Sequence, residues 1–337
     1  MGRVSIRDIA AETGYSPATV SNVLNEKGNV GAKATGIVLE AVKRLGYRRV
    51  SQLDRVIFAV GRVNGRIVDE SPFHAGVYAG IERAAKRLGL APSMVTLDLS
   101  NPRSRKKNIE ELERASTAGV VLLASEMVDD EEYALFEGFE LPLVIVDGWS
   151  DKMPFDCVTI ANEAAAYRAT ALLAENGHER LGYIGSNFRI KNFPQRARGF
   201  MHVLADMWIS FDEKNRIFVD PSPELAVGQI LDWLNSRPRE ELPTGIFCDN
   251  DPIAASLIQA LNQSGLRVPD DVSVMGFGDE RLCQLVQPPL SSVHVPRHEM
   301  GEMAVRRLME QTTDPHHASC VTMLHTNIVS RASIKRL

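Results

Sequence analysis

Hydrophobic residues in the first 45 positions recur at three- and four-residue spacing, which places them on one face of a helix. Three segments show this spacing: Ile6, Ile9 and Ala10; then Val20, Val23 and Leu24; then Val38, Leu39, Val42 and Leu45. Gly14 can take the left-handed conformation that ends the first helix. Ser16 can cap the second helix, and Pro17 suits its first position. The pattern predicts two short helices joined by a tight turn, followed by a third helix.

From residue 56 onward, short β-branched runs alternate with amphipathic helical segments. Examples are VIFAV at 56–60, VVLLA at 120–124 and LVIVD at 143–147, and the alternation restarts with LGYIG at 181–185. Strands that alternate with helices form a parallel sheet covered on both faces. Two such units in succession predict two α/β lobes, with a ligand cleft at the carboxyl ends of their strands.

The second predicted helix bears small polar side chains off its apolar face. Thr19, Ser21 and Asn22 lie there, and Asn25 follows directly. Hydroxyl and amide groups can bond phosphate oxygens or base edges, and a helix-turn-helix places its second helix in the major groove of DNA. The residues alone leave one alternative open, an ordinary helical hairpin whose polar side chains face water.

Charge is distributed unevenly along the 337 residues. Residues 1–55 contain nine Lys/Arg and five Asp/Glu, a net charge of +4. The whole chain has 38 basic and 43 acidic residues, which leaves 29 and 38 for the rest, a net charge of −9. A basic N-terminal segment on an acidic body fits contact with a polyanion, although a small domain of arbitrary charge fits the same numbers.

No feature of the chain indicates export, a membrane span or catalysis. The start MGRVSIRDIA lacks the apolar region of a signal peptide, and no stretch has the length of a bilayer span. The four cysteines form no C-x-x-C pair, so we expect them to be small buried hydrophobic residues: Cys157, Cys248, Cys283 and Cys320. No G-x-S-x-G, H-E-x-x-H, P-loop or G-x-G-x-x-G motif occurs. We expect a cytoplasmic protein that is not an enzyme, without cofactor or metal.

The sequence resembles LacI/GalR-type bacterial transcription regulators over almost its whole length. The pattern I-x-D-I-A-x-x-x-G-x-S-x-x-T-V-S-x-V-L-N matches Ile6–Asn25, and L-G-Y follows at Leu45–Tyr47. In the body, L-P-L-V-I-V-D matches Leu141–Asp147, R-x-x-G-F matches Arg196–Phe200, and V-P-D-D-V-S-V-x-G-F matches Val268–Phe277. The body alone is similar to periplasmic sugar-binding proteins. The resemblance implies an α/β fold, with an all-α helix-turn-helix headpiece before a two-lobed body of parallel sheets.

The resemblance also implies a homodimer whose two headpieces read the half-sites of a near-palindromic operator in double-stranded DNA. Pro17, Ala18 and Asn22 stand at base-reading positions, where Asn22 can bond an adenine edge and Ala18 can touch a thymine methyl. For Pro17 and Ala18, ordinary helix-start chemistry is an equal alternative. The positions that match phosphate contacts are Ser5, Ser16, Thr19, Ser21, Asn25 and Lys33.

In the body, the resemblance implies a small polar effector, such as a sugar or related metabolite, that binds between the lobes and controls operator affinity as in a repressor. Asp147, Arg196 and Asn250 match ligand-binding positions, and their groups suit a ligand rich in hydroxyls. Loop capping is the alternative for Asp147 and Asn250. Phe73 and Trp149 can stack on a ring or pack at a domain edge. The complete predicted effector set is Ser71, Phe73, Asp147, Trp149, Arg196, Asn250 and Asp279.

The family's organisation implies a headpiece with a short linker, followed by a body for effector binding and dimerisation. The chain would pass between the two lobes of this body three times. The predicted ranges are 1–55 for the headpiece and 56–337 for the body, with an amino-lobe of about 56–160 and 294–320 and a carboxyl-lobe of about 161–289 and 321–337. A solute-binding receptor without a DNA role is the competing hypothesis. The headpiece and the absence of an export signal argue against it.

The sequence departs from the family pattern at three places. The linker after Leu45–Tyr47 is shorter than usual and lacks the P-N-x-x-A-R-x-L hinge helix, so Leu53 is the only candidate for a minor-groove wedge. The third helix opens with Gly31–Thr35 in place of S-x-x-T-R, which removes phosphate-binding groups. The family's cleft aspartate is Gly278 here, next to Asp279. The effector therefore need not be a common sugar.

Overall fold

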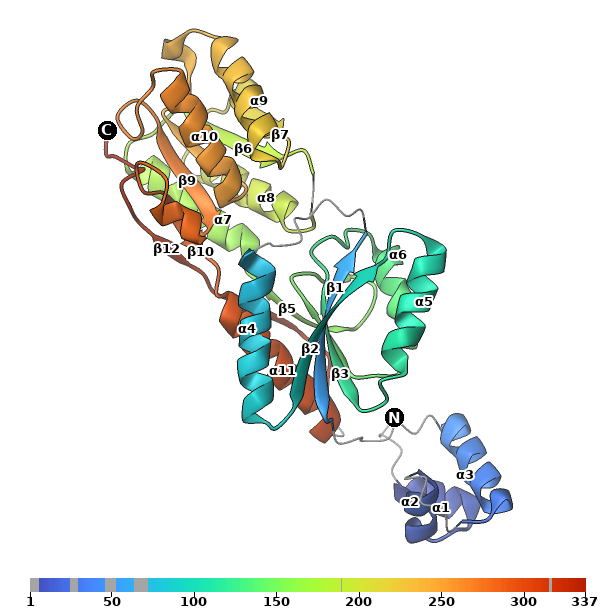
Figure 1. The fold of residues 1–337 in the computed structure, drawn as a ribbon. Coiled ribbons are helices and arrows are strands. Elements are labelled where there is room, and N and C mark those ends of the chain that lie inside the picture. The colour runs from blue at the N-terminus through green and yellow to red at the C-terminus, as the bar shows by residue number, and fades with distance from the viewer. Residues whose placement is uncertain (1–5, 25–29, 46–52, 64–71, 189, 315–316) are drawn as a thin grey trace.

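The computed structural model describes residues 6–24, 30–45, 53–63, 72–188, 190–314 and 317–337. It contains a small helical headpiece and two α/β lobes stacked end to end (Figure 1). No helix within these ranges combines the length and the apolar character that a membrane crossing requires.

The headpiece consists of α1 (Ile6–Thr13), α2 (Pro17–Leu24) and α3 (Ala32–Leu45), as the hydrophobic spacing predicts. Ile9, Val20 and Val38 are fully buried between the three helices. Their cluster shares no residue with the hydrophobic clusters of the body. The headpiece thus has a core of its own, and it lies apart from the lobes in Figure 1.

The first lobe is built on a parallel sheet whose strand order is β11-β5-β4-β3-β1-β2. Its strands are β1 (Arg55–Arg62), β2 (Ala91–Asp98), β3 (Ala118–Leu123), β4 (Leu143–Val146), β5 (Asp156–Ile160) and β11 (Val321–Leu324). α4 (Pro72–Arg87) and α11 (Arg297–Thr313) cover one face, and α5 (Pro102–Glu113) and α6 (Asp130–Tyr133) cover the other (Figure 1). Both faces of the central strands are therefore buried, which explains their continuous apolar runs.

The second lobe repeats this plan with the strand order β12-β10-β9-β8-β6-β7, in which only β12 pairs in the antiparallel direction. Its strands are β6 (Leu181–Ser186), β7 (Arg216–Val219), β8 (Gly245–Cys248), β9 (Ser273–Gly278), β10 (Ser291–His294) and β12 (Asn327–Val329). Its helices are α7 (Asn162–Glu175), α8 (Phe193–Asp206), α9 (Pro223–Asn235) and α10 (Asp251–Gln263). α7 packs with α8, and α9 packs with α10. The predicted two-lobed α/β fold class is confirmed.

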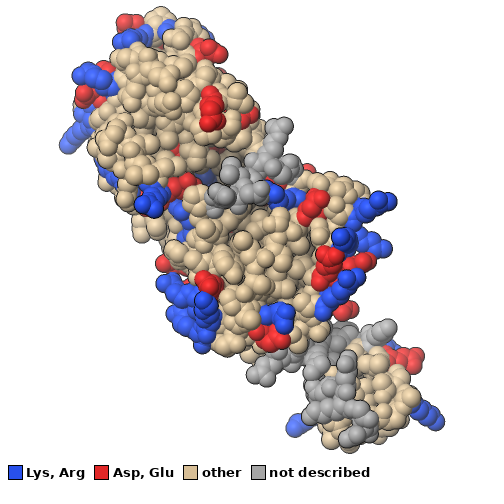
Figure 2. All heavy atoms as spheres, viewed as in Figure 1, with Lys and Arg blue, Asp and Glu red and all other residues tan. Residues whose placement is uncertain are grey.

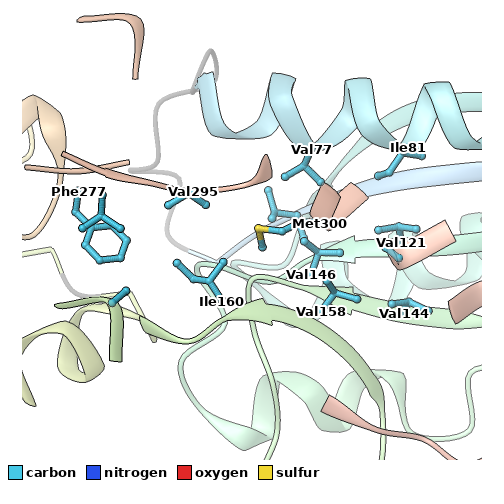
Figure 3. Packing of buried hydrophobic residues seen from close by; sticks show 14 of the residues in the cluster. Val77, Ile81, Val121, Val144, Val146, Val158, Ile160, Phe277, Val295 and Met300 are labelled. Atoms are coloured by element: carbon cyan, nitrogen blue, oxygen red, sulfur yellow. The ribbon is translucent and has the colours of Figure 1, made fainter. Parts of the chain in front are cut away.

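One hydrophobic cluster runs from the first lobe into the second. In Figure 3, Val77, Val146 and Met300 point toward one another between α4, the first sheet and α11. Val295 and Phe277 continue this cluster at the junction with the second lobe. The two lobes are therefore packed against each other and not merely tethered by the crossing strands.

The sequence-based boundary of the second lobe is wrong at residues 321–324. These residues were expected in the carboxyl-lobe, but they form β11, which pairs in parallel with β5 of the first sheet. The Cys157 amide donates a hydrogen bond to the Cys320 carbonyl, so β11 extends the first sheet by one edge strand. The chain then passes to the second lobe between Leu324 and Asn327, where β12 begins.

A close helix crossing fixes α11 against α4. A β-carbon placed on Gly80 would lie 2.0 Å from the His298 carbonyl oxygen, and one on Gly301 would lie 2.2 Å from the Val77 carbonyl oxygen. Only glycine permits such an approach of two helix backbones. This contact holds the first residues of α11, which lead out of the crossing segment, in a defined position.

Candidate nucleic-acid interface and effector cleft

The turn between α1 and α2 has the geometry that its residues predict. Gly14 takes a φ of +71°, and its amide donates to the Ala10 carbonyl at 2.9 Å, which closes α1. The Ser16 hydroxyl accepts from the Thr19 amide at 3.1 Å and so caps α2. These bonds fix the angle at which α2 leaves the turn.

One face of α2 is buried and the opposite face is free to meet a partner. Val20 and Val23 pack into the headpiece core, whereas Pro17 and Ala18 are exposed and Asn22 is half-buried. Ala18 and Asn22 are four residues apart, so they lie on the same side of the helix. The structure therefore places Ala18 and Asn22 together on the outer face of α2, with Pro17 exposed at the start of the helix.

The predicted phosphate-contacting residues within the described ranges are at least partly exposed. Ser16 and Lys33 are exposed, and Thr19 and Ser21 are partly exposed. Basic side chains project from the headpiece surface in Figure 2. An ion pair between Arg44 and Glu12 ties α3 to α1. Ser5 and Asn25 lie outside the described residues.

The second site is a buried polar network at the junction of the two lobes, centred on Asp147. This residue follows β4 with a φ of +59°, a left-handed conformation that non-glycine residues rarely take and that concentrates at functional sites. Its carboxylate accepts from the Ser125 hydroxyl at 2.5 Å and from the Asn192 side-chain amide at 2.7 Å. Burial raises the pKa of Asp147, while the Ser125 bond and the nearby Arg196 charge act in the opposite direction.

Arg196 forms the carboxyl-lobe half of this network. Its Nε donates to the Asn162 side chain at 3.0 Å and its Nη1 to the Asp249 carbonyl at 2.6 Å. The guanidinium also lies 3.7 Å from the centre of the Phe277 ring, a cation–π contact. Burial lowers the pKa of Arg196, although the carboxylates of Asp249 and Asp147 oppose that shift.

Trp149 lies on the amino-lobe side of the same junction and is covered by a residue that the sequence did not single out. The Lys191 ammonium donates to the Trp149 carbonyl and lies 5.0 Å from the centre of the Trp149 ring. It also lies 4.8 Å from the centre of the Tyr133 ring. Burial lowers the pKa of Lys191, and Asp130 counteracts this shift.

Two predicted effector residues have partners within the carboxyl-lobe. The Asn250 side chain accepts from the Ile253 amide at 3.0 Å and caps α10, as the capping alternative proposes. Asp279, with a φ of +53°, accepts from Arg331 at 2.5 Å and lies 2.9 Å from Nδ1 of His294. Burial would raise the pKa of Asp279, but the hydrogen bonds from Arg331 and His294 prevail and lower it.

Phe73 lies in the first turn of α4 and packs partly on the main hydrophobic cluster. Beside α4, the carboxyl ends of β1 and β3 border a small open depression. The residues that line it include His74, Ser125 and the buried Glu126. Glu126 accepts a hydrogen bond from the Val63 amide at 2.8 Å. Ser71 lies outside the described residues.

Sequence reasoning found Asp147, Trp149 and Arg196, which the structure brings together, but it missed Ser125, Asn162, Lys191 and Asn192. Asn162 and Asn192 stand at helix starts, where asparagine is ordinarily read as a cap. Nothing in the sequence shows that these two amides meet at 3.1 Å. Their role depends on a contact between segments thirty residues apart.

Family models match both parts of the chain. The description "Bacterial regulatory proteins, lacI family" matches residues 5–49, and "Periplasmic binding protein-like domain" matches residues 170–334. The chain is also 30% identical over 336 residues to the HTH-type transcriptional repressor PurR of Photobacterium profundum, covering 99% of each protein. The chain belongs to the lacI family. It is a DNA-binding transcriptional regulator. Members of this family are regulators and not enzymes.

Other relatives and solved structures agree with this assignment. The PurR repressor of Aliivibrio fischeri is 30% identical over 335 residues and 98% of each chain. The structure of a transcriptional regulator CelR–cellobiose complex matches with a TM-score of 0.73 at 25% identity, covering 98% of this chain and 100% of that one. A lac repressor dimer bound to operator and the anti-inducer ONPF shares the fold, with a TM-score of 0.72 at 21% identity over 99% of both chains.

Proposed function

We propose that this lacI-family regulator is a homodimeric, sequence-specific repressor whose affinity for its operator is set by a small polar effector bound between the lobes. The observation that carries the proposal is the attachment of an exposed α2 reading face to a two-lobed body with a buried polar junction. A ligand that prefers one arrangement of the lobes shifts the population of DNA-competent dimers by its difference in affinity.

The headpiece supplies the DNA contacts. We assign base reading to Pro17, Ala18 and Asn22, because Ala18 and Asn22 share the outer face of α2 and Pro17 is exposed at its start. We assign phosphate contact to Ser5, Ser16, Thr19, Ser21, Asn25 and Lys33. Residues 1–55 would act as the DNA-binding unit and residues 56–337 as the sensor and dimerisation unit.

The cleft supplies effector binding. We assign Asp147, Trp149 and Arg196 to it first, because they meet at the junction of the lobes. Ser71, Phe73, Asn250 and Asp279 complete the proposed set. The cellobiose in the CelR complex supports a sugar or a related hydroxyl-rich molecule as the effector class. We place the protein in the cytoplasm, where operator DNA is accessible.

Binding of the full-length protein to DNA from upstream of its own gene tests the proposal. Fluorescence anisotropy at several salt concentrations should show sequence-preferring binding that weakens as salt rises, because phosphate contacts release counterions. A panel of mono- and disaccharides is then added at a fixed protein concentration, and one of them should change the apparent Kd. Equal binding to operator and scrambled DNA would contradict the repressor assignment.

A further inference from the structure

The strand β11 forms one outer edge of the first sheet, beside β5. The Ala161 amide, directly after β5, donates to the Leu324 carbonyl at 3.2 Å, so the backbone of Leu324 faces β5. Successive residues of a strand direct their amide and carbonyl groups to opposite sides. The backbone groups of Val321 and Met323 therefore point away from β5, out of the sheet.

The side chains at this edge are apolar and reach the surface. Val321 is 46% exposed and Met323 is 57% exposed, whereas Thr322 and Leu324 are partly covered. This alternation is typical of a strand with one covered face. The edge thus combines outward-pointing backbone groups with two apolar side chains on one face.

The edge carries none of the features that ordinarily prevent strand pairing. Soluble proteins place charged residues or proline in their edge strands for this purpose. The opposite edge of the same sheet, β2, contains Pro92 and Asp98, and the edge strand β7 begins with Arg216. By contrast, the sequence from Ala318 to Ser330 contains no Lys, Arg, Asp, Glu, Gly or Pro. β11 is therefore an open template for a further strand.

A second copy of the chain fits this edge because β11 is complementary to itself. When two β11 strands run antiparallel with Thr322 opposite its own counterpart, Val321 lies opposite Met323 of the partner subunit, and Met323 opposite Val321 of the partner subunit. Both of these pairs can exchange two backbone hydrogen bonds, since their backbone groups point outward. Like charges opposite each other destabilise a strand pair, and this segment has none. The same residues supply both halves of a two-fold contact.

We propose that β11 pairs with β11 of a second copy about a two-fold axis at Thr322, so that the first sheets of two subunits become one continuous sheet. The β2 edge and the second lobe remain available for the contact within a homodimer, so the β11 pair joins two homodimers into a tetramer. The pairing is independent of the DNA-binding role. Its consequence, that one assembly holds two operators, rests on the proposed function.

Disulfide cross-linking tests the register of the pair. In the proposed arrangement, two Thr322→Cys residues form a non-hydrogen-bonded pair with Cα atoms about 4.5 Å apart, within the range of about 4.4–6.8 Å that a disulfide spans. The Cys320→Ser background removes the exposed native thiol, whose Sγ lies 3.7 Å from the Thr322 hydroxyl. Mild oxidation of the full-length protein should join two chains. Arg103→Cys, an exposed position on α5 in the same background, should leave single chains.

The mass of the assembly in solution tests the pairing without any cross-link. Met323→Lys places a cation in the strand pair and should halve the mass measured by light scattering, from four chains of 37.2 kDa to two. Val321→Lys alters the same pair from its other member and should do likewise. Val128→Lys, at a position of the first lobe that is 42% exposed, is the control and should keep the parent's mass.

Circular dichroism checks that each lysine variant is folded, which the exposure of the substituted positions favours. A parent mass that neither Met323→Lys nor Val321→Lys lowers would overturn the proposal. Cross-linking of Thr322→Cys that is no faster than that of Arg103→Cys would also overturn it.

Operator binding by the same variants separates this proposal from the proposed function. Met323→Lys should keep the parent's Kd for a single operator duplex, because β11 lies outside the headpiece. It should lose the ability to bridge a bead-bound operator and a labelled second operator. Intact operator binding with equal masses would contradict the β11 pair alone. Absence of sequence-preferring binding by the parent would contradict the proposed function and leave the mass result standing.

Discussion

Leu53 lies directly against Gly119, with its Cδ1 atom 2.9 Å from the position of a β-carbon on that residue. Only 5% of Leu53 is exposed, and it belongs to the hydrophobic cluster of the first lobe. The Asp54 amide donates to the Thr117 carbonyl, and the Asp54 carbonyl accepts from the Ala91 amide. Leu53 is thus anchored in the body, which argues against its interpretation as a minor-groove wedge.

We expect Leu53→Ala to destabilise the first lobe by about 2–5 kcal/mol, because it leaves a cavity beside Gly119 and Leu308. Thermal unfolding followed by circular dichroism measures the change. At a temperature where the variant is folded, its operator affinity and the bend angle of bound DNA should match those of the parent. A reduced bend angle without a change in unfolding temperature would restore the wedge interpretation.

Gly80→Ala should destabilise the protein by about 1–3 kcal/mol or more, because the added methyl would overlap the His298 carbonyl. Gly228→Ala on α9 is the matched control. No atom lies within 4 Å of its β-carbon position, so alanine should stabilise that helix by about 0.5–1 kcal/mol. Urea unfolding curves of both variants, compared with the parent, should move in opposite directions.

The hydrogen bonds of Asp156 lead us to predict that the protein loses stability in acid. Its buried carboxylate bonds Arg307, Gln311 and His317, joining β5 to the end of α11. Burial would raise the pKa of Asp156, but these bonds outweigh it and lower the pKa below 3.8. A folded pKa below the unfolded one stabilises the protein above the unfolded value, and this contribution disappears as pH falls through the folded value.

Unfolding temperatures between pH 5 and about pH 2 measure this contribution. Asp156→Asn should lower the unfolding temperature at pH 5 and flatten its dependence on pH below the ordinary aspartate value of 3.8. Asp220→Asn, a substitution in the other lobe, serves as the control and should keep the parent's slope. If the unfolding temperature of Asp156→Asn depends on pH as steeply as that of the parent, Asp156 does not cause the loss of stability in acid.

The hydrophobic spacing was sufficient to predict the headpiece helices and the two α/β lobes, because each helix or strand pattern is local. β11 was misplaced because strand pairing depends on which edge is available, and Val321–Leu324 carries no signal that favours one sheet. The family motifs were sufficient to locate Asp147 and Arg196, because these motifs are also local sequence patterns. Lys191 and Asn192 could not be predicted, because their partners are set by how the lobes meet.

The division of the headpiece into base-reading and phosphate-contacting residues gives the last prediction. Asn22 is half-buried on the reading face of α2, and Lys33 is an exposed cation at the start of α3. Asn22→Ala should weaken operator binding by about 1–3 kcal/mol and reduce the preference for operator over scrambled DNA. Lys33→Ala should weaken binding to both DNAs similarly and lower the salt slope by about one.

Anisotropy titrations at four salt concentrations with both DNAs measure the two effects, and Glu40→Ala, an exposed change on α3, is the control. If the two variants lose affinity and salt dependence alike, Asn22 contacts phosphate and not bases, and the reading face must lie elsewhere on α2.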